Sequence, residues 1–300
     1  MLQMKGNLME NTKLKGNRGF KIKNEISVVC AGDCNFIKPI QVMIKSIEVN
    51  TSAPVNVYIL QKGWNIEEKK ETIRKFSEEK IKIHFIQMDR DIPEEQLKVS
   101  ATIPIEAYYR LFLDKLLPEA MEQVIYLDGD LLVEGDIKEL WEIPMDGKAL
   151  MAATEMFHEA YYVSSPLALR TWKKMGIPEK QKYFNSGVLK VNLKKWRQEK
   201  IGEKIIQYLT ENKEDVLWHD QDGLNAVLWN DRKELPAEWN VMTALFYETD
   251  YSRINITEKE AKMWMEHPKI LHYTNSKEKP WKETCRHPRK DRYFVYESVL

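Results

Sequence analysis

The alternation of short apolar runs with amphipathic segments in the first third of the chain is the feature that most constrains its fold. Residues 26–31 form an apolar run suited to a buried parallel strand, residues 55–60 are expected to form a second strand, and residues 81–86 a third, with the alternating pattern Ile-Lys-Ile-His-Phe-Ile. Between them, residues 40–49 and 66–76 carry apolar side chains at helical spacing. Strand and helix in alternation are typical of a parallel sheet with helices on its faces. In such a sheet ligands bind at the carboxyl ends of the strands.

The pattern resumes in the middle of the chain, without an internal repeat or a long Gly/Ser linker. We therefore predict an α/β fold with one Rossmann-like domain and a mostly parallel central sheet. A polar N-terminal extension over residues 1–24 and a short basic C-terminal tail over residues 283–300 would flank it. The further elements expected are a helix over 105–113, strands or apolar pieces at 123–127, 131–133, 150–153 and 186–191, and a helix over 193–209.

The composition describes a globular protein with one sizeable core, because 43% of the 300 residues are hydrophobic. The formal net charge is zero, so binding to nucleic acid is not predicted. Charge is unevenly placed, with a balance of +4 in residues 1–25 and +3 in residues 276–300. These basic ends predict either contact with an anionic membrane or glycolipid, or two solvated segments on an acidic body, and we prefer the second.

Three cysteines, Cys30, Cys34 and Cys285, give an odd count without paired spacing. This argues against a disulfide framework and for a reducing compartment. We interpret Cys30 and Cys34 as small core residues, because no second Cys/His pair completes a zinc site. No apolar run approaches 18 residues, so a cytoplasmic protein is expected, with peripheral attachment to the inner face of the membrane as an alternative.

A pair of carboxylates, Asp128 and Asp130, lies within an otherwise apolar stretch. Residues i and i+2 of an extended chain point to the same side, so both can address one ion. Isolated buried carboxylates are costly, and a divalent cation offsets that cost. Gly129 between them would let a phosphate or ribose approach the backbone closely. The pair therefore predicts a metal site.

Two other Asp-x-Asp triplets have simpler explanations. Asp89-Arg-Asp91 carries a bulky cation and precedes a polar helix start, which favours a capping or surface role. Asp220-Gln-Asp222 opens an apparent helix, and a helix start and a functional site remain open alternatives there. A phosphatase of the haloacid-dehalogenase type also places two acids after a strand, but near the N-terminus and before Gly-Thr. Here the pair is mid-chain and is followed by Leu-Leu, which disfavours that class.

His272 ends the apolar run that begins at Ile270, and precedes a polar segment ending in Lys-Pro-Trp. A histidine at a strand end is by itself more often a packing residue than a ligand. With a carboxylate pair that needs further ligands, it becomes a candidate third ligand. A mixed imidazole and carboxylate set suits Mn²⁺ better than Ca²⁺.

Six short motifs occur in order between residues 25 and 282: Ala31-Gly-Asp33-Cys-Asn35, Tyr108-Tyr-Arg110-Leu, Tyr126-Leu-Asp128-Gly-Asp130, Tyr183-Phe-Asn185-Ser-Gly187-Val, Asp220-Gln221-Asp222-Gly-Leu-Asn225 and His272-Tyr with Lys279-Pro280-Trp281. This set resembles glycosyltransferase family 8, above all its bacterial lipopolysaccharide galactosyl- and glucosyltransferases. The resemblance implies a GT-A fold over residues 25–282, a UDP-hexose donor, Mn²⁺ (with Mg²⁺ as an alternative) and retention of anomeric configuration. It also implies a saccharide or glycolipid acceptor, in synthesis of cell-surface polysaccharide or lipopolysaccharide.

The resemblance further implies residue roles on the nucleotide side of the site. Asp128, Asp130 and His272 would hold the metal against the pyrophosphate, and Lys279 would reach the β-phosphate. The segment around Lys279 is one residue longer than in close relatives and lacks their glycine, so Lys277 is an alternative. The residues implied at the uracil, the ribose and the lining of the base pocket are Asp33, Asn35 and Ala31.

On the sugar side, the resemblance implies that Arg110, Asn185 and Asp222 surround the hexose and that Gln221 lies nearest the anomeric carbon. Glu155 replaces an aspartate of close relatives and is a further site residue that could alter donor choice. A glutamine is a weak nucleophile, so we expect front-face attack by the acceptor rather than a covalent intermediate. A non-catalytic nucleotide-sugar-binding protein of the same fold and a protein-directed or self-glucosylating transferase remain alternatives.

Overall fold

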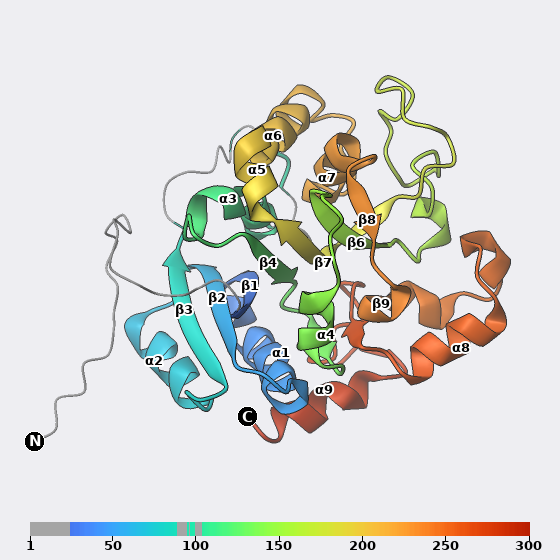
Figure 1. The fold of residues 1–300 in the computed structure, drawn as a ribbon. Helices are drawn as coiled ribbons and strands as arrows, with labels where there is room; N and C mark the ends of the chain where they lie inside the picture. Colours follow the sequence, from blue (N-terminus) through green and yellow to red (C-terminus); the bar gives the residue numbers. More distant parts are fainter. Residues whose placement is uncertain (1–24, 89–94, 96, 100–103) are drawn as a thin grey trace, which may run out of the picture.

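The computed structural model describes residues 25–88, 95, 97–99 and 104–300 (Figure 1). The predicted extension over residues 1–24 and the triplet Asp89-Arg-Asp91 lie outside these described residues. The main sheet has seven strands in the order β3-β2-β1-β4-β7-β6-β8. They are β1 (Ile26–Asp33), β2 (Val55–Lys62), β3 (Ile81–Gln87), β4 (Gln123–Leu127), β6 (Leu150–Thr154), β7 (Phe184–Asn192) and β8 (Arg232–Glu234).

Strand β7 is antiparallel to both of its neighbours, β4 and β6, whereas the other neighbouring pairs of this sheet are parallel. The prediction of a mostly parallel sheet is therefore confirmed. A second sheet of three short strands has the order β5-β10-β9. Its strands are β5 (Leu131–Val133), β9 (Val241–Met242) and β10 (Ile270–His272).

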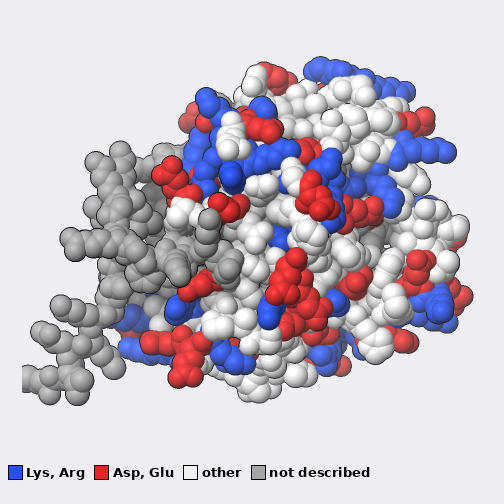
Figure 2. Space-filling view, viewed as in Figure 1, with Lys and Arg blue, Asp and Glu red and all other residues white. Residues whose placement is uncertain are grey.

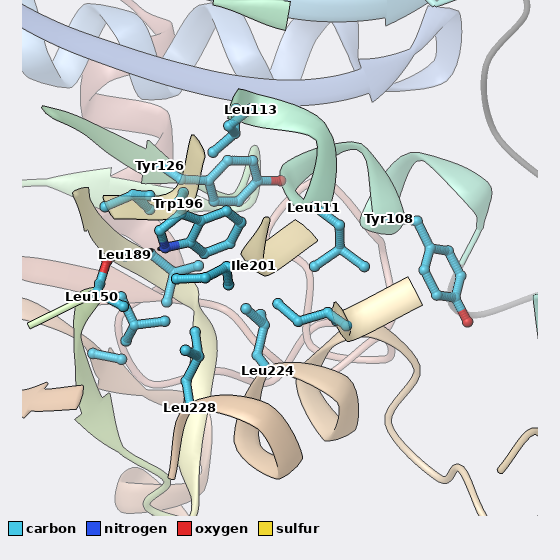
Figure 3. Close-up of a cluster of buried hydrophobic side chains, with 14 of the residues drawn as sticks. Tyr108, Leu111, Leu113, Tyr126, Leu150, Leu189, Trp196, Ile201, Leu224 and Leu228 are labelled. Carbon is cyan, nitrogen blue, oxygen red and sulfur yellow. Dashed lines mark hydrogen bonds between the residues drawn. The ribbon is translucent and has the colours of Figure 1, made fainter. Parts of the chain in front are cut away.

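Helices cover both faces of the main sheet. Successive residues of β1 divide between two apolar clusters, with Val29 in one and Val28 and Cys30 in the other, as the period-two geometry of a strand requires. One cluster packs against α5 (Leu193–Glu199), α6 (Ile201–Glu211) and α7 (Asp220–Leu228), and Figure 3 shows Trp196, Ile201, Leu224 and Leu228 in it. The other packs against α1 (Ile37–Asn50) and α4 (Ile137–Glu142).

The remaining helices are short or lie at the periphery. Helix α2 (Ile66–Arg74) begins with a capping box, because the Asn65 side chain and Glu68 bond each other's backbone N–H. Helix α8 (Glu258–Glu266) begins in the same way at Thr257 and Glu260. Within the ranges that the structure describes, no helix is long and apolar enough to cross a membrane. Acidic and basic side chains are interspersed on the face seen in Figure 2.

Two predicted helices differ in the structure. Residues 193–209 form two helices, because Lys200 adopts the left-handed conformation (φ 52°, ψ 46°) and separates α5 from α6. Apolar periodicity continues across this break, so the pattern did not reveal it. Residues 105–113 form a 3₁₀ helix, Ile105–Phe112, followed by the short α3 (Leu113–Leu116).

The C-terminal residues are packed rather than loose. Helix α9 (Lys290–Glu297) lies beside α1, and its Tyr293 and Tyr296 are buried with Leu132 and Leu271 of the small sheet (Figure 1). The expectation of a tail is therefore wrong for residues 290–297. The interpretation of both cysteines as core residues is half wrong, because Cys30 is buried but Cys34 is exposed.

Candidate active site

Polar residues from four strands meet at one edge of the main sheet. Strands β1, β4 and β6 run in the same direction and end at this edge. Asp33 is the last residue of β1, Asp128 follows β4, and Glu155 follows β6. Strand β7 runs the other way, so its first residues, including Asn185, lie at the same edge. The ligand-binding edge predicted from the alternating pattern thus collects four of the predicted site segments.

The carboxylates of Asp128 and Asp130 and the imidazole of His272 converge. One ligand atom from each lies within 4.8 Å of the others. Nε2 of His272 is 3.1 Å from Oδ1 of Asp130 and 3.8 Å from Oδ2 of Asp128. The small sheet brings them together, because His272 pairs with Leu131, the residue directly after Asp130. Two carboxylates and an imidazole form a donor set that fits a divalent transition metal.

A lysine neutralises one of these carboxylates. Nζ of Lys279 contacts Oδ2 of Asp130 and donates to the backbone carbonyl of Tyr273. Burial by itself would raise the pKa of Asp130, but the charges of Lys279 and His272 and the hydrogen bonds from both hold it below its usual value. Lys277, the alternative suggested by the sequence, is exposed. The buried lysine is therefore the one beside the carboxylate pair.

Arg110 lies buried between two acids. Its Nη2 is 2.8 Å from Oδ1 of Asp128, and its Nε is 3.1 Å from Oδ2 of Asp220. Its guanidinium also stacks on the ring of Tyr126, 4.3 Å from the centroid. Burial raises the pKa of Asp220 to about 6, although Arg110 acts in the opposite direction. Asp220 was missed as an individual site residue, since its place at a helix start had two interpretations.

Asp222, predicted to contact the sugar, is fully buried. Its Oδ1 accepts from the hydroxyl of Tyr183, and its Oδ2 accepts from the backbone N–H groups of Leu217 and Trp218. Both oxygens therefore fix the start of α7 in place. In the described structure Asp220, and not Asp222, joins the polar cluster around Arg110.

The other predicted sugar-side residues form one hydrogen-bonded group. Nδ2 of Asn185 donates to Oε2 of Glu155 at 3.0 Å, and Nε2 of Gln221 lies 3.5 Å from the same oxygen. Oε1 of Glu155 accepts from the backbone N–H groups of Met156 and Phe157. Oε1 of Gln221 accepts from the backbone N–H of Ser186 at 2.9 Å. The structure thus brings Glu155, Asn185 and Gln221 together.

Three residues of the predicted nucleoside pocket lie at the end of β1. Asp33 accepts from the backbone N–H and the side-chain amide of Asn35, at 2.9 and 2.7 Å. Asn35 is exposed and Asp33 half-buried, so this turn is accessible from solvent. Ala31 is half-buried on the face that α5–α7 cover.

Two glycines of the site are required by packing. A Cβ on Gly129 would lie 2.9 Å from Ile40 and 3.2 Å from Phe36, so packing against α1 and the turn before it is by itself a reason for glycine there. A Cβ on Gly187 would lie 2.1 Å from Cε1 of His272 and 2.7 Å from Oδ2 of Asp128. The absent side chain of Gly187 therefore lets these two candidate ligands approach each other.

A sequence model described as glycosyl transferase family 8 matches residues 27–285, most of the chain and every segment of this site. The chain belongs to glycosyl transferase family 8. This family 8 transferase is 30% identical to general stress protein A of Bacillus subtilis over 286 residues, which cover 92% of the chain and 94% of that protein. It is 25% identical to a lipopolysaccharide 1,2-glucosyltransferase of Escherichia coli K12 over 276 residues, 90% of the chain and 77% of that protein.

Comparison with solved structures gives the fold type of the transferase. The structure of the galactosyltransferase LgtC in complex with donor and acceptor sugar analogs matches with a TM-score of 0.76, covering 92% of this chain and 96% of that one. At 23% sequence identity this likeness shows the fold alone. The predicted GT-A type fold of the transferase is confirmed.

Proposed function

We propose that the protein is a metal-dependent, retaining glycosyltransferase that moves glucose or galactose from a UDP-sugar to a saccharide or glycolipid acceptor. The observation that carries this proposal is the convergence of Asp128, Asp130 and His272 beside the cations of Arg110 and Lys279. A negatively charged leaving group can be held there by several positive charges at once. The donor sugar, the acceptor and the metal dependence are part of the proposal.

Asp128, Asp130 and His272 would hold the divalent cation, with Mn²⁺ favoured over Mg²⁺ by the imidazole ligand. When bound, the cation would counter the negative charge that develops on the departing diphosphate. Lys279 lies buried against Asp130 and would add a second positive charge on the same side. Asp33 and Asn35 lie at the accessible end of β1, where we place the uridine, with Ala31 lining the pocket.

The hexose would lie over the group formed by Glu155, Asn185 and Gln221. Oε1 of Gln221 is held by the Ser186 N–H, which fixes a carbonyl dipole near the proposed anomeric carbon. Because an amide is a weak nucleophile, the acceptor hydroxyl would attack from the face that the diphosphate leaves, with that leaving group taking the proton. Mass spectrometry of the enzyme under turnover tests this, and a covalent glycosyl-enzyme would refute it.

The proposed acceptor class is supported by the relatives, which include a protein named lipopolysaccharide 1,2-glucosyltransferase. A glycolipid acceptor would bring the transferase to a membrane surface, so we propose a cytoplasmic enzyme, with peripheral contact at that surface as the alternative. Basic residues near the C-terminus, among them Arg286, Arg289 and Lys290, provide charge for that contact.

The first experiment measures UDP release from a panel of UDP-sugars without acceptor, in Mn²⁺ and in EDTA. We expect release from one sugar in Mn²⁺, none in EDTA, and none from Asp130→Ala. Asp146→Ala is the matched control, because Asp146 is an exposed acid in the turn before β6, at the opposite edge of the sheet.

Other outcomes of that experiment would favour the two alternatives. UDP binding without release from any sugar, with or without candidate saccharide acceptors, would indicate a nucleotide-sugar-binding protein. A mass increase of one or more hexoses on the chain itself would indicate a self-glucosylating transferase.

A further inference from the structure

Asn240 is a fully buried amide that the sequence motifs did not single out. It lies between a 3₁₀ turn, Ala237–Trp239, and strand β9. Strand β9 pairs in parallel with β10, with Met242 beside His272, so the backbone holds Asn240 close to the histidine. Its side chain makes two contacts, to Nδ1 of His272 at 2.8 Å and to Oδ1 of Asn185 at 3.0 Å.

The orientation of the Asn185 and Asn240 amides follows from the backbone N–H of Gly187, because a backbone N–H can only donate. The backbone N–H of Gly187 donates to Asn185 at 2.9 Å, so the atom that receives it is the carbonyl oxygen of the Asn185 amide. The Asn240 atom beside that oxygen is then its NH₂ group, and the Asn240 oxygen faces Nδ1 of His272. Nδ1 therefore carries a proton, and Nε2 is the nitrogen directed at Asp128 and Asp130.

The same chain of contacts reaches the sugar side of the site. Asn185 uses its oxygen for Gly187 and Asn240, and its NH₂ group for Glu155. Asn240 thus links the imidazole of the proposed metal site to the residues over which we place the hexose. Partners of this kind, which bond the second nitrogen of a histidine ligand, set its tautomer and its ring orientation.

We propose that Asn240 is a positioning residue that presents Nε2 of His272 to the metal and fixes Asn185 at the donor sugar. The proposal rests on the proposed metal site and on no contact of Asn240 with substrate. The Asn240 oxygen contacts His272, and its NH₂ group contacts Asn185. Substitutions that remove one or both of these groups therefore separate the effect on the metal from the effect on the sugar.

The test measures the dissociation constant of Mn²⁺ by electron paramagnetic resonance at fixed pH, with UDP present. Asn240→Leu keeps the shape but loses both groups, and we expect Mn²⁺ affinity to fall by roughly 10- to 100-fold. Asn240→Asp keeps an acceptor for His272 and loses the donor to Asn185. Its Mn²⁺ affinity should stay within about threefold of the wild type, while UDP-sugar hydrolysis falls by roughly 10- to 100-fold.

Asn212→Leu is the matched control, because Asn212 is also buried and hydrogen-bonded but lies at the end of α6. Its Mn²⁺ affinity should equal that of the wild type at a similar loss of thermal stability. Wild-type affinity in Asn240→Leu, or an equal loss in Asn240→Leu and Asn240→Asp, would overturn the positioning role alone. If the wild-type protein binds no divalent cation, the metal site fails and this proposal fails with it. Should Asn240→Leu not fold, Mn²⁺ affinity lost in Asn240→Asp would still refute the proposal.

Discussion

Substituting Gly187 by alanine would place a methyl group between two proposed metal ligands. The added Cβ would lie 2.1 Å from Cε1 of His272, whereas carbon atoms in contact are normally about 3.5 Å apart. The imidazole would have to move by roughly 1.4 Å, and Oδ2 of Asp128 would be crowded at 2.7 Å. Metal–ligand distances tolerate about 0.2 Å, so the site cannot keep its three ligands. We expect Mn²⁺ affinity to fall by at least about 100-fold.

The assay for Gly187→Ala combines a Mn²⁺ titration with thermal unfolding. Overpacking of this kind costs about 1–3 kcal/mol, which corresponds to a fall in Tm of a few degrees. Gly135→Ala is the control, because its Cβ would also be crowded, at 2.9 Å from Lys269, at a turn after β5 that lies outside the site. Mn²⁺ affinity equal to that of the wild type in folded Gly187→Ala would refute the reasoning.

Three further predictions follow from single residues. The pKa of Asp220 is about 6 in the folded protein and lies above its value in the unfolded chain. The stabilisation that the protonated carboxyl gives the folded state is therefore complete below about pH 4 and is lost as the pH rises through 6. Between these pH values the unfolding free energy of the wild type should fall, relative to Asp220→Asn, by up to about 3 kcal/mol in denaturant titrations; a constant difference would contradict this. Lys200→Gly replaces a lysine in the left-handed conformation between two helices, and should raise the unfolding free energy by about 0.5–1 kcal/mol. UDP-sugar hydrolysis should not change, and a loss of stability would show that the turn is not strained. Tyr183→Phe leaves Oδ1 of buried Asp222 without its donor and should cost about 1–3 kcal/mol in the same titrations, and a neutral effect would mean that the bond contributes nothing.

Much of the main sheet could be predicted from sequence because its central strands are buried on both faces. Such strands read as short apolar runs, and the runs at 26–31, 55–60 and 123–127 became strands, whereas the edge strand at 81–86 was predicted from its alternating pattern. The break at Lys200 could not be predicted, because the apolar positions on either side continue the same helical spacing. The exposure of Cys34 depends on a turn after β1 whose direction is set by its packing and not by its residue types.

The proposed metal ligands could be predicted because each stands out locally. Asp128 and Asp130 interrupt an apolar stretch, and His272 ends a strand. Asn240 and Gly187 instead stand out through their neighbours in space, which lie more than 30 residues away in sequence. Asn240 is hydrogen-bonded to His272, and Gly187 lies against both His272 and Asp128. No local pattern contains such a contact, so only the folded structure reveals it.

Because β7 runs antiparallel to β6, the chain between them starts and ends at the same edge of the sheet. The length of β7 is fixed by its pairing, whereas exposed residues of the connection can vary in number. Residues 155–183 leave the sheet at the end of β6 and return to the same edge at the start of β7. The register of β7 is set by its five pairs with β4, from Leu127 opposite Val188 to Gln123 opposite Asn192. Insertions in the exposed residues 173–176 would therefore change the surface on this side of the sheet while Asn185 and Gly187 stay in place. The length of this exposed turn can thus change the surface offered to the proposed acceptor while the proposed cation ligands keep their geometry.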